Sequence, residues 1–285
     1  ETKDQDRCDS SVYENSFMQQ VLKGVMTAKE EVESFGGTVK IYEIEGAEPE
    51  KVMAAMKELR EAGFNGIAMT PSEDQLLKAR IDQYSEEYGI PVVTFNADLE
   101  DTKRLCFVGQ DTFQSGRTAA GLMNEMTDGK GQVAIISGQI ANPGLISRQK
   151  GFTTEIKENF PELEVVDIRY SYDDEWVASK IVEELLELYP ELTGIYITGH
   201  GVKGVCQTLK KLGKDRSMHV IANDFLEENK KWLQDGTINF LIGQDAEVQG
   251  HSPVTILFQL LFDSKAPEKE FQYTDIVIRT KYNMS

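Results

Sequence analysis

Residues 194–224 read GIYITGHGVKGVCQTLKKLGKDRSMHVIAND, and this stretch decides the fold class. It opens with a short apolar run, Gly194–Thr198, and closes with a second run, His219–Ala222. Between them lies an amphipathic segment that ends near Gly213, where a glycine can terminate a helix. Two strands joined through a helix pair in parallel by a right-handed crossover. The stretch therefore predicts one strand–helix–strand unit of an α/β protein.

The same alternation extends along the rest of the chain. Further apolar, strand-like runs are predicted at 38–42, 66–70, 91–95, 105–108, 133–136, 163–169, 238–242 and 273–279. Amphipathic helices are predicted at 17–32, 50–62, 76–84, 113–127, 145–159, 174–189, 226–235 and 246–262. The pattern restarts after Val108, so two doubly wound parallel-sheet lobes fit better than one large sheet. A closed eight-fold barrel shares this rhythm, but it does not account for the polar residues that follow the strands.

Polar residues recur directly after the apolar runs. In open parallel sheets, ligands bind beyond the carboxyl ends of the strands, which makes these residues ligand candidates. They are Thr70, Ser72, Asn96, Asp98, Asp111, His200, Asp224 and Gln244. Carboxylates accept hydroxyl hydrogens, and amides both donate and accept, so the set suits a small polyhydroxylated ligand. The alternative for each position is a helix N-cap or a loop residue.

Two further kinds of side chain suit a sugar. Arg148 lies early in a predicted helix, where a cation is unfavourable to the helix dipole, and its guanidinium can fork to ligand hydroxyls or to a carboxylate. The alternative for Arg148 is exposure to solvent. Phe17, Tyr172 and Trp176 are candidates for stacking on the apolar face of a sugar ring, with core packing as the alternative.

Composition excludes several classes of function. The 285 residues carry a net charge of −18, which opposes binding to nucleic acid or to an anionic membrane surface. No apolar stretch reaches transmembrane length, and the three scattered cysteines favour a reducing compartment. Neither the cysteines nor the three histidines have the spacing of a metal site or a catalytic motif. We therefore expect no metal, no cofactor and no catalysis.

Several of these residues together resemble the type I periplasmic-binding-protein fold, which sugar-binding proteins share with the effector domains of lactose-repressor-type regulators. The resemblance covers nearly the whole chain. Its pieces are, in chain order, Asn15-Ser16-Phe17 with Gly24, Gly66-Ile67-Ala68 with Pro71, Gly89-Ile90-Pro91-Val92-Val93, Val108-Gly109-Gln110-Asp111, Arg148 with Gly151-Phe152, Asn223-Asp224 and Gln244-Asp245.

The resemblance implies two lobes joined by three crossings, with a sugar held in the cleft between them and closure on binding. It implies an N-terminal lobe of residues 1–109 plus 245–270 and a C-terminal lobe of residues 110–244 plus 271–285. It also implies ligand contacts from Asn15 and Phe17. One departure is the strand that the family places before its first helix, because residues 1–16 offer only Val12 and Tyr13 for it.

Within the family, the segments Gly199–Cys206, Asp235–Ile238 and Asp275–Arg279 resemble regulator effector domains more than exported binders. We therefore expect the sugar-sensing domain of a transcriptional regulator, which is cytoplasmic, forms a homodimer through helices flanking the sheets, and reaches DNA only through a segment absent from this chain. The alternative is an extracytoplasmic solute-binding protein of a sugar ABC transporter, periplasmic or anchored at the cell surface, which should be a monomer.

Overall fold

The computed structural model describes residues 17–44 and 48–284. Asn15, the first of the expected ligand residues, lies outside these ranges. The chain divides into two compact units, Glu1–Gln110 with Asp245–Asp275 and Asp111–Gln244 with Ile276–Ser285. It therefore passes from one unit to the other three times, and each unit combines separate stretches of the sequence.

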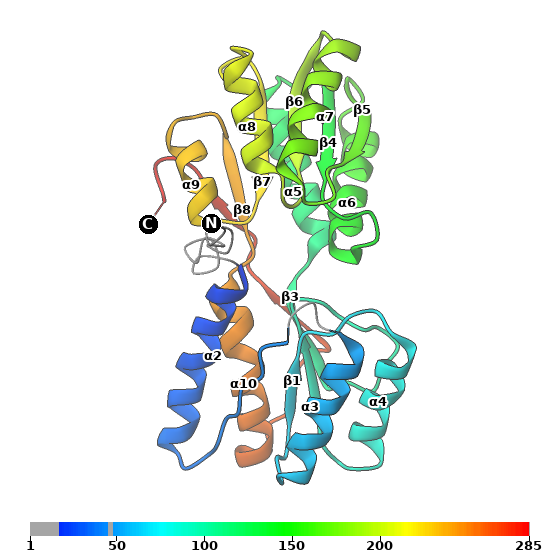
Figure 1. Cartoon of the computed structure of the whole chain (residues 1–285), viewed down its shortest axis with the longest axis vertical. Coiled ribbons are helices and arrows are strands. Elements are labelled where there is room, and N and C mark those ends of the chain that lie inside the picture. Colours follow the sequence, from blue (N-terminus) through cyan, green and yellow to red (C-terminus); the bar gives the residue numbers. More distant parts are fainter. Residues whose placement is uncertain (1–16, 45–47, 285) are drawn as a thin grey trace, which may run out of the picture. The chain divides into compact units, whose positions relative to one another are not determined.

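The first unit is built on a parallel sheet whose described strands have the order β1-β2-β3-β9 (Figure 1). These strands are β1 (Ile67–Met69), β2 (Val92–Phe95), β3 (Cys106–Gln110) and β9 (Phe271–Thr274). Its helices are α2 (Phe17–Ser34), α3 (Pro49–Glu61), α4 (Gln75–Glu86) and α10 (Ala246–Asp263). Val92 packs in a cluster with residues of α3 and α4, whereas the next residue, Val93, packs with Leu257 of α10. Helices therefore cover both faces of this sheet.

The second unit is built on a sheet with the strand order β10-β8-β7-β6-β4-β5. The strands are β4 (Gly131–Ser137), β5 (Leu163–Tyr170), β6 (Leu192–Ile197), β7 (His219–Asn223), β8 (Phe240–Gly243) and β10 (Val277–Arg279), of which β10 alone among the described strands runs antiparallel to its neighbour. The helices are α5 (Thr112–Met126), α6 (Pro143–Asn159), α7 (Glu175–Leu188), α8 (Val202–Lys211) and α9 (Glu227–Gln234).

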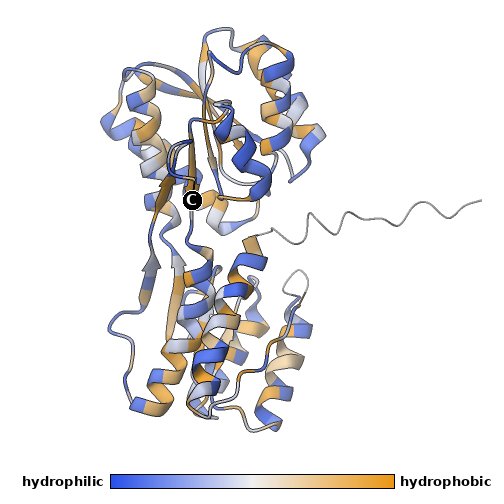
Figure 2. Ribbon diagram, turned by 90° about the vertical axis from the view of Figure 1, so that its left-hand side faces the viewer, coloured by the Kyte–Doolittle hydropathy of each residue, from blue (hydrophilic) through white to orange (hydrophobic). Residues whose placement is uncertain are grey.

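Alternation along the strands places helices on both faces of this sheet too. On β4, Val133 and Ile135 join a buried cluster with α5 and α6, whereas Ala134 and Ile136 join a cluster with α7, α8 and α9. Strands buried on both faces must be apolar throughout, and Figure 2 shows strands of this unit in the colours of hydrophobic residues. Both units are thus doubly wound α/β sheets, as the sequence predicted.

The close packing of α5 against α6 in the second unit depends on two glycines. A Cβ atom on Gly116 of α5 would lie 2.0 Å from the carbonyl oxygen of Arg148 on α6. Reciprocally, a Cβ atom on Gly151 of α6 would lie 2.0 Å from the carbonyl oxygen of Phe113 on α5. Only glycine permits this approach of the two backbones, and the approach sets the position of the first turns of α6.

Two predicted strands differ from the structure. Residues 38–42 form no strand within the described chain, in which β1 lies at the edge of its sheet. Alternating hydrophobicity shows which side chains can face a core, but it does not show whether a neighbouring strand receives the backbone hydrogen bonds.

Residues 273–279 are likewise not one strand. The first part belongs to β9, which pairs in parallel with β3, and the second part is β10, which pairs with β8 in the other sheet. The predicted start of the C-terminal lobe at residue 271 is therefore too early, because the chain leaves the first unit after Asp275. Periodicity runs through this position, so only strand pairing reveals the change of sheet.

Candidate ligand-binding site

Buried hydroxyl groups lie at the carboxyl ends of β4 and β6 in the second unit. Ser137 ends β4, and Thr198 directly follows β6. The Thr198 hydroxyl donates to Oγ of Ser137 over 2.9 Å, and the hydroxyl of Ser171, just after β5, donates to the Ser137 carbonyl oxygen over 3.2 Å. All three residues are buried. The carboxyl edge of this sheet is thus a polar layer formed by several strands.

Arg148 from α6 reaches the same edge. Its side chain is buried, and Nη1 donates to the Thr198 carbonyl oxygen over 2.8 Å. The guanidinium carries further N–H donors and has no acceptor. Exposure to solvent, the alternative considered for Arg148, is therefore wrong. The close approach of α5 and α6 at Gly116 holds the backbone from which this side chain extends.

Asp224 and Gln244, which are distant in sequence, lie next to each other. The Gln244 amide nitrogen donates to Oδ1 of Asp224 over 2.5 Å. Asp224 has a φ of 70°, in the left-handed region that Asn and Asp tolerate better than other non-glycine residues. Its carbonyl oxygen accepts from the side chain of buried Asn229 over 3.0 Å, and its N–H donates to Ile242 over 2.9 Å. These bonds hold the Asp224 carboxylate at the end of β7.

Asn223, beside Asp224, belongs with it to the polar pair at the end of β7 and carries part of the family resemblance. It is 1% exposed, and its Oδ1 accepts from the Tyr196 hydroxyl over 2.8 Å. Tyr196 is wholly buried and stacked on Phe152 with 4.8 Å between ring centroids, and burial raises its pKa. The Asn223 amide nitrogen has no hydrogen-bond partner in the described structure. The polar pair Asn223-Asp224 after an apolar strand was the signal that identified Asp224, and it applied equally to Asn223.

A small pocket opens beside Asp224 and His200. It has room for roughly one water molecule, so it cannot hold a sugar ring by itself. Its lining residues are Glu175, Gly199, His200, Gly201, Val202, Asn223, Asp224, Leu226, Glu228 and Asn229. The Glu175 carboxylate accepts from the N–H of Gly204 in the first turn of α8, and burial raises the pKa of that carboxyl.

The other predicted residues of this unit are more exposed. Tyr172 and Trp176 are 57% and 69% exposed, so neither is part of the core. Tyr172 also has a φ of 55°, an uncommon conformation for an aromatic residue. His200 is exposed, with its Nδ1 3.6 Å from a carboxylate oxygen of Asp173. The Asp111 side chain accepts from the N–H of Gln114 and caps α5, which is the alternative role we considered for it.

In the first unit, Thr70 and Asn96 follow β1 and β2. The Thr70 hydroxyl is buried and has no partner in the described structure, which fits a group that a ligand satisfies. Asn96 has a φ of 63°, and its side-chain nitrogen lies 3.9 Å from the sulfur of Met18. Phe17 begins α2, and Ser72 lies between β1 and α4; both are partly buried.

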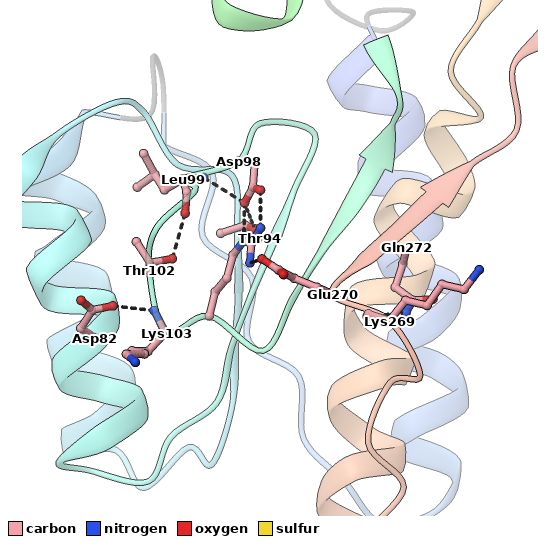
Figure 3. Close-up of polar contacts among 10 residues, drawn as sticks. Asp82, Thr94, Asp98, Leu99, Thr102, Lys103, Lys269, Glu270 and Gln272 are labelled. Carbon is pink, nitrogen blue, oxygen red and sulfur yellow. Dashed lines mark hydrogen bonds and ion pairs between the residues drawn. The ribbon is translucent and has the colours of Figure 1, made fainter. Parts of the chain in front are cut away.

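Asp98 is engaged in a buried ion pair of the first unit (Figure 3). Its two carboxylate oxygens accept from Nε and Nη2 of Arg104, each over 2.6 Å. Oδ1 also accepts from Thr94, and Arg104 binds Glu270 over 2.8 Å as well. The Arg104 side chain is only 2% exposed, so this pairing compensates a buried charge. We therefore leave Asp98 out of the ligand set that we propose below.

The described residues offer neither a metal site nor a membrane-spanning helix. They contain no group of three or more His, Cys, Asp or Glu residues arranged to hold a metal ion. None of the described helices is both long and apolar enough to cross a membrane.

Comparison with known proteins identifies one family and solved structures of the same fold. The family model described as periplasmic binding protein domain matches residues 10–265. The ribose import binding protein of Bacillus subtilis is 21% identical over 241 residues, which cover 84% of this chain and 76% of that protein. A solved sugar-binding protein of a sugar ABC transporter from Bacillus halodurans superimposes with a TM-score of 0.85 at 24% identity, over 94% of each chain. A LacI transcriptional regulator from Bacteroides fragilis, described as putative, has a TM-score of 0.79 at 24% identity, over 94% of this chain and 93% of that one.

Proposed function

Because the chain belongs to the periplasmic binding protein domain family, we propose that it is the solute-binding protein of a sugar importer and that it binds a neutral monosaccharide. In the second unit, the proposed ligand residues are Arg148, Tyr172, His200, Asp224 and Gln244. In the first unit they are Phe17, Thr70, Ser72 and Asn96, with Asn15 included by resemblance alone.

The observation that carries this proposal is the combination of Arg148, Asp224 and Gln244 at one sheet edge. The Asp224 carboxylate accepts hydroxyl hydrogens, and the Arg148 guanidinium donates to hydroxyl oxygens. A sugar hydroxyl does both, so it can bridge groups of this kind. Acidic Asp224, Glu175 and Glu228 near the same pocket disfavour an anionic ligand such as a sugar phosphate.

Transport is favoured over gene regulation by the similarity to the ribose import binding protein. We had expected a cytoplasmic, dimeric regulator domain. The sensor domain of a regulator is the second candidate function, because the chain shares its fold with the LacI-type regulator. A transport function would place the protein outside the cytoplasm.

Titration calorimetry against D-ribose, D-arabinose, D-xylose, D-galactose and D-ribose 5-phosphate tests the proposal. We expect one neutral sugar to bind at one site per chain and the phosphate to bind far more weakly. Tight binding of the phosphate, or failure of every neutral sugar to bind or to raise the thermal unfolding midpoint, would refute sugar binding.

The molecular mass in solution separates the two candidates. A transport protein that carries one ligand works as a monomer, whereas a regulator core reads paired DNA half-sites as a dimer. We expect light scattering at tens of micromolar to give the mass of one chain, about 32 kDa. A stable dimer, with or without sugar, would favour the regulator.

A further inference from the structure

Asn223 holds a hydrogen-bond donor that the described protein leaves unused. It is the last residue of β7, it is 1% exposed, and its Nδ2 has no partner in the described structure. A buried donor without an acceptor destabilises the folded state, and most such groups in native proteins have a partner. An unused donor at the carboxyl edge of a sheet, directly beside Asp224, therefore needs an explanation.

Tyr196 determines which end of the Asn223 amide is left unused. The Tyr196 hydroxyl donates to Oδ1 over 2.8 Å, and this leaves the N–H groups as the unpaired end. If the amide were turned around, Nδ2 would donate to the Tyr196 oxygen, and both Oδ1 and the Tyr196 proton would lack partners. The observed orientation leaves fewer groups unsatisfied, so Tyr196 fixes Asn223 as a donor.

The unused donor of Asn223 lies at the same sheet edge as the residues proposed to bind the ligand. Asn223 and Tyr196 lie on the face of the sheet that packs against α5 and α6, from which Arg148 reaches the same edge. Arg148 donates to the carbonyl oxygen of Thr198, which directly follows the strand of Tyr196, and that strand pairs with β7, at whose end Asn223 and Asp224 lie.

We propose that Asn223 determines ligand specificity by donating an N–H to one oxygen of the bound sugar, with Tyr196 as the residue that positions the amide. This inference rests on the proposed function. A position that only donates requires an atom that accepts, which is a hydroxyl or ring oxygen. It discriminates against analogues that carry hydrogen, a methylene or an ammonium group at that place.

A set of three proteins tests this inference: the wild type, Tyr196→Phe, and the double variant Tyr196→Phe/Asn223→Leu. Without sugar, the double variant should unfold at the same temperature as the wild type or higher, because it removes the unused donor together with its clamp. Tyr196→Phe alone should unfold at a lower temperature, because it leaves both ends of the amide unpaired. This arm of the experiment needs no ligand.

The second arm uses the neutral sugar that the wild type binds best, together with each of its monodeoxy derivatives and its carbocyclic analogue. The double variant should bind the parent sugar about tenfold more weakly than the wild type, the effect of one lost hydrogen bond. One analogue should bind weakly to the wild type and yet lose nothing further in the double variant, and that analogue identifies the oxygen that meets Asn223.

The outcomes separate the two proposals. If the wild type binds no neutral sugar, the proposed function fails, and this inference fails with it. If the wild type binds sugar, but the double variant binds every analogue as the wild type does, only the inference on Asn223 is wrong. A double variant that unfolds well below the wild type without sugar would also overturn it, because Asn223 would then be a satisfied structural residue.

Discussion

At the scale of single residues, Asp224 combines an uncommon backbone conformation with a carboxylate that Gln244 holds in place. Its φ of 70° makes alanine a poor substitute, since alanine would add backbone strain to the loss of the carboxylate. We expect Asp224→Asn to keep the backbone and to weaken sugar binding by about 1.5–3 kcal/mol, the contribution of hydrogen bonds to a charged group. Titration calorimetry measures this loss.

The matched control is Asp128→Asn. Asp128 has a φ of 52°, but it lies exposed between α5 and β4, away from the carboxyl edge of the sheet. The Asp128→Asn variant should bind sugar with the affinity of the wild type. Equal affinity of Asp224→Asn and the wild type would remove Asp224 from the ligand set.

His219 gives the folded protein a predictable response to acid. Burial lowers the pKa of its imidazole below the ordinary value of 6.5. The unfolded chain therefore takes up a proton at a higher pH than the folded protein does, so acidification through 6.5 favours unfolding. The contribution of neutral His219 to the free energy of unfolding is therefore complete above pH 6.5 and is lost as the pH falls below that value.

We expect His219→Gln to lose less stability than the wild type when the pH falls from about 7.5 to 5.5, since it has no proton to take up. Urea unfolding at several pH values gives the two free energies of unfolding. Parallel curves over this range would show that the His219 pKa is the same in the folded and unfolded states.

At the scale of elements, the approach of α5 to α6 depends on Gly116. An alanine methyl group there would lie 2.0 Å from the Arg148 carbonyl oxygen, so the two helices would have to separate. Overpacking of this kind destabilises by about 1–3 kcal/mol. We expect Gly116→Ala to lower the free energy of unfolding by this amount and to weaken sugar binding as well, because the backbone that carries Arg148 must move.

Gly121→Ala in the same helix is the control. A Cβ atom at Gly121 would meet nothing within 4 Å, so this variant should gain about 0.5–1 kcal/mol from the higher helix propensity of alanine. Unfolding curves and calorimetry of both variants test the pair. Equal stability of Gly116→Ala and Gly121→Ala would contradict the argument from close packing.

At the scale of the whole molecule, the three passages of the chain between its units bear on how it responds to ligand. Family resemblance predicts closure, and a sugar that gains contacts from both units favours the closed state. We expect saturating sugar to reduce the radius of gyration in small-angle scattering. Asp224→Asn at the same sugar concentration should show a smaller change, and an unchanged wild-type curve would rule out closure.

The sequence by itself determined the fold class and most of the elements. Apolar runs of strand length alternating with amphipathic helices predicted doubly wound sheets, and the N-cap alternative considered for Asp111 is the role that its side chain has in the structure. The rule that ligands bind beyond the carboxyl ends of parallel strands made Asp224 and Gln244 ligand candidates. Local periodicity and composition suffice here because they depend on neighbours within one turn or one strand.

Only the tertiary structure decided which polar residues meet. Asp98 and Asp224 both lie after an apolar strand, yet Arg104 engages the first in an ion pair and Gln244 contacts the second. Residues 273–279 continue one periodic pattern, yet they divide between two sheets. Tyr196 leaves Asn223 with an unused donor through a contact between adjacent strands. Hydrogen-bond partners that are distant in sequence depend on the packing of whole elements, which no local pattern encodes.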